Sequence, residues 1–341
     1  MIVALILLAF ASSLILTGAM RRYALHADLL DHPNVRSSHS TPTPRGGGIA
    51  IVFSSMAAAL VAWWLAPTAD RTVAILVGTS LVVAFVGFLD DHSGVPARWR
   101  FSAHAAAAAA ALWAMHGIPS VPVFGHSLDL QWFGLLLAVV YLTWMVNLYN
   151  FMDGIDGIAS IEAITVLLGG TLCWWLASAT PLWFIPVVFA AAVAGFLFWN
   201  YPPARIFMGD SGSGFIGMVL GLLSLWTAQE HTQVFWCWFI LLGCFMVDAT
   251  TTLVRRVRRG DKFHEAHRSH AYQFASRRFG SHQRVSLSIG IINLVWLMPI
   301  ALLVALGRLD GVVGTIVGYV PLVTLAFRLK AGDRSGQQSL A

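Results

Sequence analysis

Charged residues are scarce in this chain of 341 residues. Asp, Glu, Lys and Arg make up only 11% of it, whereas hydrophobic residues make up 57% and the mean hydropathy is +0.73. A soluble domain usually carries about 25% charged residues, so this chain has too little charge to cover a water-facing surface. The composition therefore excludes an ordinary soluble protein and indicates an integral membrane protein.

Cysteine is almost absent as well. The three residues, Cys173, Cys237 and Cys244, lie inside apolar runs, and none of them belongs to a CxxC pair. This placement predicts small buried hydrophobic side chains and gives no support to a thiolate metal site.

Long apolar runs recur along the whole chain, and the ten-residue alternating strands of a membrane barrel are missing. In lipid, only helices and closed barrels satisfy the backbone, so these runs predict transmembrane helices. We therefore expect an all-α integral membrane protein of about eleven transmembrane helices, forming a single domain over residues 1–341. The runs lie near 2–20, 46–66, 72–89, 101–116, 131–149, 158–178, 182–199, 214–228, 235–253, 285–306 and 312–330.

Lys and Arg fall almost entirely on one side of such an arrangement. Of the 21 basic residues, all but Arg71 and Arg308 lie in five segments: 21–45, 90–100, 200–213, 254–284 and the tail from 328 onward. Because cytoplasmic loops carry the excess of Lys and Arg, we expect the N-terminus outside and the C-terminus inside. Residues 254–284 would then form a long cytoplasmic loop. Basic residues follow the first run rather than precede it, which indicates a retained helix and not a cleaved signal peptide.

Two adjacent carboxylates, Asp90 and Asp91, end an apolar run on the inner side. They repel each other and oppose the helix dipole at a C-terminus, so something positive should compensate them. One interpretation is a salt bridge to Arg98 or Arg100, which follow closely. The other is a metal or catalytic site.

The segment NLYNFMDGIDGIAS, residues 147–160, places four polar side chains three residues apart between two apolar runs. This spacing predicts a polar stripe at the inner end of a helix, formed by Asn147, Asn150, Asp153 and Asp156. Asp156 could also cap the helix that follows, although a cap would not need four polar residues.

The segment NYPPARIFMGDSGSGFIG, residues 200–217, begins with two prolines that should end the preceding helix. Asp210 follows within a Gly- and Ser-rich turn, just before a new apolar run. Small residues at a helix start expose backbone N–H groups, which suits a phosphate. A plain turn with an N-cap is the alternative.

The long inner loop is basic and rich in histidine. His264, His267 and His270 recur every three residues, and an arginine cluster precedes them. The arginines would anchor the chain to anionic lipid headgroups. The histidines fit phosphate binding at least as well as zinc, because they have no cysteine partners nearby.

These polar groups share one side of the membrane, and together they indicate a reaction. Carboxylate and amide oxygens favour Mg²⁺, and basic groups beside Mg²⁺ favour a phosphate substrate. We expect Mg²⁺-dependent phosphotransfer involving a lipid at the cytoplasmic face. A transporter is the non-enzyme alternative, but its charges would lie near the bilayer midplane. A lipid phosphotransferase of the CDP-alcohol type would need another aspartate spacing.

The motifs NLYNFMDGIDGIA and FMGDSGS, with the aspartate pair at a helix end, resemble the polyprenyl-phosphate N-acetylhexosamine-1-phosphate transferases of glycosyltransferase family 4. The resemblance runs from HSTPTPRGGG to HRSHAYQ, and the loop HEAHRSHAYQ is more similar to the O-antigen-initiating branch than to the peptidoglycan translocase. It implies transfer of an N-acetylhexosamine-1-phosphate from a UDP-N-acetylhexosamine to undecaprenyl phosphate. The products are a polyprenyl-diphosphate-sugar and UMP. The implied place is the cytoplasmic face of the bacterial inner membrane.

The resemblance also implies roles for individual residues. Asp210 matches the ligand of Mg²⁺, for which Mn²⁺ is an alternative, and Asp153 matches a further ligand. The residues expected to act in catalysis are Asp90, Asp91, Asp153, Asp156, His267 and His270. Those expected to bind substrate are Asn147, Asn150, Asn200, Phe207, which matches a position where uracil stacks, and Arg268.

The chain departs from the family pattern at two places. The middle histidine of the family motif is Ser269 here, and the lysine that the peptidoglycan branch carries after its aspartate pair is replaced within HSGVPARWR. His92, Arg98 or Arg100 could substitute for that lysine. Asp248 also fits the O-antigen branch, without an assigned role.

Several alternatives stay open at this point. The lipid phosphate could attack directly, positioned or deprotonated by Asp90 or Asp91, or a carboxyl-phosphate intermediate could form first. The amino sugar could be GlcNAc or a 6-deoxy relative such as FucNAc or QuiNAc. No nucleic acid partner is expected, membrane lipids surround the chain, and a monomer and a homodimer are both compatible with the sequence.

Overall fold

The computed structural model is a bundle of helices that describes residues 1–33, 38, 41–65, 71–261 and 268–333. The helices are α1 (Ile2–His26), α2 (Gly48–Leu65), α3 (Arg71–Ser93), α4 (Ala97–Ala114), α5 (Gln131–Met152), α6 (Ile158–Ser178), α7 (Phe184–Asn200), α8 (Asp210–Glu230), α9 (Val234–Leu241), α10 (Gly243–Arg258), α11 (Ala271–Phe279), α12 (His282–Ile292), α13 (Met298–Ala305) and α14 (Gly311–Arg328). A π-helical segment, Asn293–Leu297, joins α12 to α13, and a 3-10 turn, Pro181–Trp183, precedes α7.

The prediction of an all-α membrane protein is confirmed. Within the described residues, eight helical segments are long and apolar enough to cross a membrane, or nine if α9 and α10, bent by 66° at their junction, form one span. A helix occupies each of the eleven apolar runs, but α2 and α4 are not among these spans. The count of eleven and the orientation therefore stay predictions. The three cysteines are buried and free, as expected.

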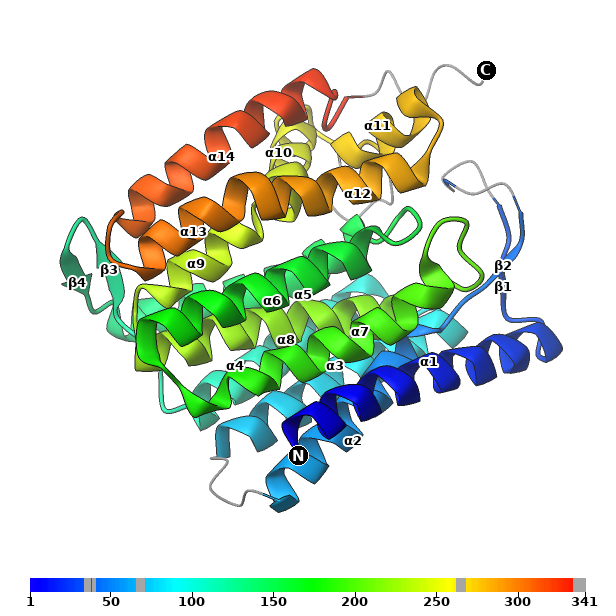
Figure 1. The fold of residues 1–341 in the computed structure, drawn as a ribbon. Helices are drawn as coiled ribbons and strands as arrows, with labels where there is room; N and C mark the ends of the chain where they lie inside the picture. Colours follow the sequence, from blue (N-terminus) through cyan, green and yellow to red (C-terminus); the bar gives the residue numbers. More distant parts are fainter. Residues whose placement is uncertain (34–37, 39–40, 66–70, 262–267, 334–341) are drawn as a thin grey trace.

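The connections between helices collect at the two ends of the bundle (Figure 1). The α5–α6 and α7–α8 connections, α11 and the β1–β2 ladder lie together at one end. In that ladder, β1 (Leu30–Asp31) pairs antiparallel with β2 (Thr43–Pro44). The hairpin of β3 (Val121–Val123) and β4 (His126–Leu128) lies at the other end. Three of the predicted inner segments thus meet at one end.

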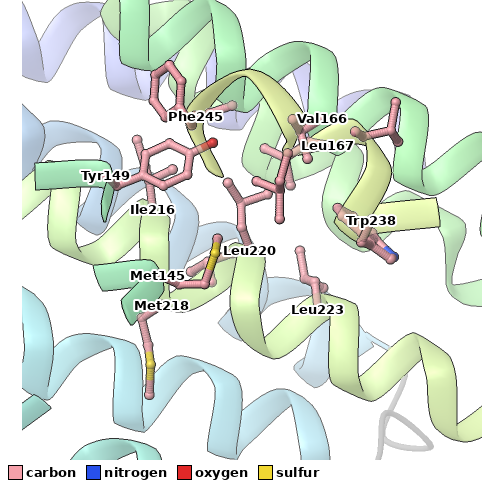
Figure 2. Close-up of a cluster of buried hydrophobic side chains, with 14 of the residues drawn as sticks. Met145, Tyr149, Val166, Leu167, Ile216, Met218, Leu220, Leu223, Trp238 and Phe245 are labelled. Atoms are coloured by element: carbon pink, nitrogen blue, oxygen red, sulfur yellow. The ribbon is translucent and has the colours of Figure 1, made fainter. Parts of the chain in front are cut away.

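Helix α8 forms the centre of the bundle and is buried along its whole apolar length, where it packs on α3, α5, α2 and α9. Figure 2 shows apolar side chains of α5, α6, α8, α9 and α10 converging on it. Among them are Met145, Val166, Leu220, Trp238 and Phe245, all of them buried. This packed core fixes α8, and therefore fixes the start of α8 at the end of the bundle where the connections gather.

Gly217 lets α8 and α5 approach closely, and its replacement by alanine should destabilise the protein. A Cβ atom at this position would lie 2.4 Å from the carbonyl oxygen of Met145, so the helices would have to separate. We expect Gly217→Ala to lower the free energy of unfolding by about 1–3 kcal/mol, measured by thermal unfolding in detergent. Gly78→Ala is the matched control, because a Cβ atom on that helical glycine meets nothing within 4 Å. Equal unfolding midpoints for the two variants would contradict the prediction.

Candidate functional site

A cavity of about 320 Å³ lies at the end of the bundle where the α5–α6 and α7–α8 connections meet. Its walls come from α3, α5, α7, α8, α11, α12 and the connections between helices. Seven of the predicted site residues line it: Asp91, Asn150, Asp153, Asp156, Asn200, Phe207 and Asp210. The fold thus brings together predicted residues that lie up to 119 positions apart in the sequence, from Asp91 to Asp210.

A second cavity of about 560 Å³ adjoins the first and shares Ser38, Asp156, Phe207 and His282 with it. Arg268, predicted to bind substrate, lines this second cavity together with Arg277 of α11. Burial, and then the charge of Arg268, lower the pKa of Arg277. A bound anion would relieve the repulsion between these two cations.

Asp91 holds the start of α8. One of its carboxylate oxygens accepts from the N–H of Asp210 at 3.0 Å and the other from the N–H of Ser211 at 3.2 Å. A carboxylate at a helix N-terminus satisfies donors that have no partner within the helix and interacts favourably with the dipole. Gly209 precedes them with φ +79°, and a Cβ atom there would lie 2.7 Å from Asp91. Asp91, from α3, is therefore a cap supplied by one helix to another.

Asp90 precedes Asp91 near the end of α3 and has other partners. Its carboxylate accepts from the N–H of Val95 at 2.6 Å and pairs with Arg100. Arg100 also donates to Asp210 at 2.9 Å, so one guanidinium joins the two carboxylates. The salt-bridge interpretation is thus confirmed for Asp90.

Of the three candidates to replace the family lysine, Arg100 contacts the aspartate pair, through Asp90. Of the two other candidates, His92 bonds the carbonyl oxygen of Phe88 in its own helix, and the guanidinium of Arg98 lies against the ring of Trp99. Arg45 also reaches the pair, because it donates to the backbone carbonyl oxygen of Asp91.

Asp153 follows the last residue of α5 and lies in the first cavity. Burial, and after it the carboxylates of Asp210 and Asp156, raise the pKa of Asp153 well above its usual range. Several carboxylates thus crowd around one cavity, where a cation would stabilise their ionised forms. Asn150, one turn earlier, donates to Ser213 at 3.4 Å.

Asp156 does not cap α6, so that interpretation is wrong. The N-cap position is Gly157, whose N–H donates to the side-chain oxygen of Asn200 at 2.9 Å. The carboxylate of Asp156 instead accepts from the N–H of Ala204 at 3.0 Å and lies 3.3 Å from Nδ1 of His282. Asp156 therefore ties the α5–α6 connection to the α7–α8 connection.

Asn200 lines the first cavity while its amide holds two backbone segments. Besides accepting from Gly157, it donates to the carbonyl oxygen of Ile206 at 3.0 Å. It is only 3% exposed. Phe207 lines both cavities, and its backbone N–H and C=O bond Pro44 and Gly47. The substrate roles predicted for these two residues stay predictions.

Three predicted residues of the described chain lie outside both cavities: Asp90, Asn147 and His270. Asn147 donates to the carbonyl oxygen of Thr143 one turn earlier in α5. His270 is buried, with Nδ1 3.3 Å from the carboxylate of Asp248. His267 lies outside the described residues. The predicted polar stripe is therefore wrong in extent, because α5 ends at Met152 and only part of the series reaches the cavity.

Asp248 acts on α11 as Asp91 acts on α8. Its two carboxylate oxygens accept from the N–H groups of Ala271 and Tyr272, each at 2.9 Å. The Tyr272 hydroxyl then donates to the carbonyl oxygen of Phe151 at 3.0 Å. This chain of contacts seats α11 on the end of α5 and places Gln273 in the cavity wall.

Four residues that were not predicted from the sequence also line the first cavity: Arg45, Ser213, Gln273 and His282. Arg45 and Ser213 lie inside the quoted motifs HSTPTPRGGG and FMGDSGS, so the motifs were a usable signal. The sequence signal for His282 is weaker. It follows Gly280 and Ser281, and the structure places Gly280 at φ +60° and Ser281 as the N-cap of α12. Such a turn marks a helix start but does not indicate which site it reaches.

The described part of the chain contains no group of three or more His, Cys, Asp and Glu side chains arranged to hold a metal ion. The carboxylates of the first cavity can therefore offer a cation only part of a coordination sphere. This pattern suits a hard cation that takes its remaining ligands from substrate oxygens and water.

Comparison with known proteins bears on the same motifs. The profile of glycosyl transferase family 4 matches residues 73–228. The decaprenyl-phosphate N-acetylglucosaminephosphotransferase of Mycolicibacterium smegmatis is 30% identical over 370 residues, covering 94% of this chain and 87% of the relative. The chain belongs to glycosyl transferase family 4. It is therefore a phosphoglycosyltransferase, as the motifs predicted.

Two other relatives match a smaller share of this chain. A probable undecaprenyl-phosphate N-acetylglucosaminyl 1-phosphate transferase of Bacillus subtilis is 28% identical over 309 residues, covering 86% of this chain and 83% of the relative. A phospho-N-acetylmuramoyl-pentapeptide-transferase of Moorella thermoacetica is 34% identical over 230 residues, covering 63% and 69%. Family membership removes the transporter and the CDP-alcohol-type enzyme as alternatives.

Proposed function

We propose that this protein transfers an N-acetylhexosamine-1-phosphate from a UDP-sugar to undecaprenyl phosphate, at the cytoplasmic face of a bacterial inner membrane. The observation that carries the proposal is the meeting of Asp153, Asp156 and Asp210 in one cavity at the end of a membrane bundle. The names of the relatives support a polyprenyl phosphate acceptor and an amino-sugar phosphate. The product would initiate a cell-surface polysaccharide such as O-antigen.

Mg²⁺ is the cation that the cavity fits best, and Asp153 and Asp210 are the residues that would hold it. Both are carboxylates in the first cavity. Burial, and after it the neighbouring carboxylates, raise the pKa of Asp153, and a cation would neutralise that neighbouring charge. Mg²⁺ commonly takes one or two protein carboxylates and completes its sphere with phosphate oxygens and water. When bound, it would stabilise the charge that develops on the transferred phosphoryl group.

Direct attack by the lipid phosphate agrees best with the contacts of the aspartate pair. An oxygen of the lipid phosphate would form a bond to the β-phosphorus of the donor while the bond from that phosphorus to the bridging oxygen breaks, and UMP leaves. Such a phosphate is already mostly dianionic at pH 7, so no base is required. Asp91 is engaged by two backbone N–H groups and Asp90 by Arg100, which suits positioning better than proton transfer.

The donor would span the two adjoining cavities. Phe207 lies in the wall shared by both and offers an aromatic ring to the uracil base. Arg268 and Arg277 in the second cavity would donate to phosphate oxygens or to the sugar. These side chains supply the cationic part of a site whose other part is strongly acidic.

The test is release of UMP by the purified protein with undecaprenyl phosphate, Mg²⁺ and a panel of UDP-N-acetylhexosamines. We expect lipid-dependent UMP from at least one donor and none after chelation. The donor that gives UMP identifies the transferred sugar, and UDP-GlcNAc, UDP-FucNAc and UDP-QuiNAc are the first donors to test. UMP release without lipid in a single turnover would favour the covalent mechanism. No lipid-dependent UMP from any donor, with a well-folded protein, would contradict the proposed function.

Mg²⁺ dependence should vary with pH. Because the pKa of Asp153 is raised, a proton competes with the cation for this carboxylate at low pH. Deprotonation favours binding, so the Mg²⁺ concentration for half-maximal activity should fall as pH rises toward the raised pKa of Asp153 and level off above it. The expected fall is at most about tenfold per pH unit if one proton leaves for each cation bound. A half-saturation that is constant or rises as pH approaches that pKa would contradict the prediction.

A further inference from the structure

His282 begins α12, directly after the N-cap Ser281. Its side chain lines both cavities, and it is 21% exposed. Neither the family motifs nor the carboxylate cluster includes it. In the sequence His282 lies near the C-terminal end of residues 254–284, the predicted basic loop. In the structure it lies in the wall that the two cavities share.

The imidazole of His282 connects two segments. Nδ1 lies 3.3 Å from the Asp156 carboxylate and 3.4 Å from the Asp156 backbone N–H, which can donate to it. Nε2 lies 3.1 Å from the carbonyl oxygen of Ser38. A carbonyl oxygen only accepts, so Nε2 carries the hydrogen of that bond.

Asp156 extends this junction to further segments. The second oxygen of its carboxylate accepts from the N–H of Ala204 at 3.0 Å, in the connection that carries Phe207. Its backbone carbonyl accepts from the hydroxyl of Ser286 at 2.7 Å, one turn along α12. The position of Asp156 thus depends on α12 at two points, and the α7–α8 connection depends on Asp156.

We propose that His282 is a positioning residue for the nucleotide-sugar donor: through Asp156 it holds the segment of Phe207 in the geometry that forms the wall between the two cavities. This inference rests on the proposed function. The contacts of His282 in the described structure are with Asp156 and Ser38 and not with the aspartate pair or Arg100, so His282 belongs to the donor side of the site. Its loss should weaken donor binding and leave the lipid acceptor unaffected.

Two amide substitutions separate the two contacts of the ring. His282→Asn keeps an amide where Nδ1 lies, within reach of Asp156, but loses the reach to Ser38. His282→Gln places its amide where Nε2 lies and loses the contact with Asp156. We expect His282→Gln to raise the KM for the UDP-sugar about tenfold, and His282→Asn to stay within about threefold of the wild-type KM. The KM for undecaprenyl phosphate should change by less than about twofold in both.

The controls decide between positioning and a general effect on folding. His126→Asn, on the exposed β4 at the opposite end of the bundle, should leave every parameter unchanged. Equal donor KM values for His282→Asn and His282→Gln, or parallel changes in the KM of donor and lipid, would overturn the inference. Direct calorimetric binding of UDP to the same variants gives an independent measure and should show the same order of affinities. Absence of UMP release by the wild-type protein would contradict the proposed function instead, and the UDP affinities would still test His282.

Discussion

Asp153→Asn is expected to lower the rate of lipid-dependent UMP release by about a thousandfold at saturating donor, lipid and Mg²⁺. Asp153 is the carboxylate whose pKa is raised by burial and, after it, by the other acidic groups around the first cavity. Asparagine keeps the size of the side chain but removes the charge that would hold the cation. A loss of several kcal/mol of transition-state stabilisation is typical when a catalytic metal loses its place.

The same substitution should leave the protein as stable as before, or make it more stable. The raised pKa of Asp153 means that its ionised form is unfavourable in the folded protein without a cation. A neutral side chain removes that cost, so the unfolding temperature without Mg²⁺ should stay equal or rise while activity falls. This opposite movement is common at functional sites, where activity needs locally unfavourable charges.

Asp129→Asn is the matched control for Asp153→Asn. Asp129 lies just before α5, at the opposite end of that helix from Asp153, and its carboxylate accepts from the N–H of Gln131. This variant should keep wild-type activity. The hypothesis about Asp153 would be wrong if its variant kept more than about a tenth of the activity, or if its unfolding temperature and activity fell together.

The sequence predicted the acidic centre of the site well, for a local reason. Asp153, Asp156 and Asp210 each lie beside glycines at a helix end, and a helix end next to an apolar run must lie at the membrane boundary. The apolar runs therefore determine how deep in the membrane these residues lie. Their meeting in one cavity depends on packing around α8, which periodicity alone does not determine.

Residues whose partners are distant in the sequence were predicted less well. Asn147 faces its own helix, because positions three apart drift around the axis and α5 ends before the series is complete. His270 and Asp248 are paired across 22 residues and stabilise the start of α11. Such caps supplied by another helix leave no short motif, so they could not be read from the chain.

Asp91→Asn should reduce stability far more than Asp90→Asn, although the two residues are neighbours and the chemical change is the same. The Asp91 carboxylate accepts two backbone N–H groups with two oxygens, whereas asparagine offers one oxygen and an NH₂ group that cannot accept. One N–H at the buried start of α8 would then lose its partner. We expect a loss of about 2 kcal/mol in the free energy of unfolding.

Asp90→Asn should change the free energy of unfolding by less than about 1 kcal/mol, because its ion pair with Arg100 is partly exposed. Thermal unfolding of both variants in the same detergent measures the difference directly. The activity of the two variants is a second measurement. Since Asp91 positions the segment that contains Asp210, its variant should lose activity together with stability, and Mg²⁺ should restore little of either.

The stability and activity of Asp91→Asn and Asp90→Asn together distinguish the roles of the two carboxylates. If Asp91→Asn is as stable as the wild type but inactive, the carboxylate acts on the substrate and the cap is incidental. If it is destabilised as expected while Asp90→Asn keeps its stability and loses activity, the two adjacent carboxylates divide their roles: Asp91 builds the start of α8, and Asp90, with Arg100, acts at the lipid phosphate. The geometry favours this division, because Arg100 is the one side chain seen to contact Asp90 and Asp210 together in the described structure.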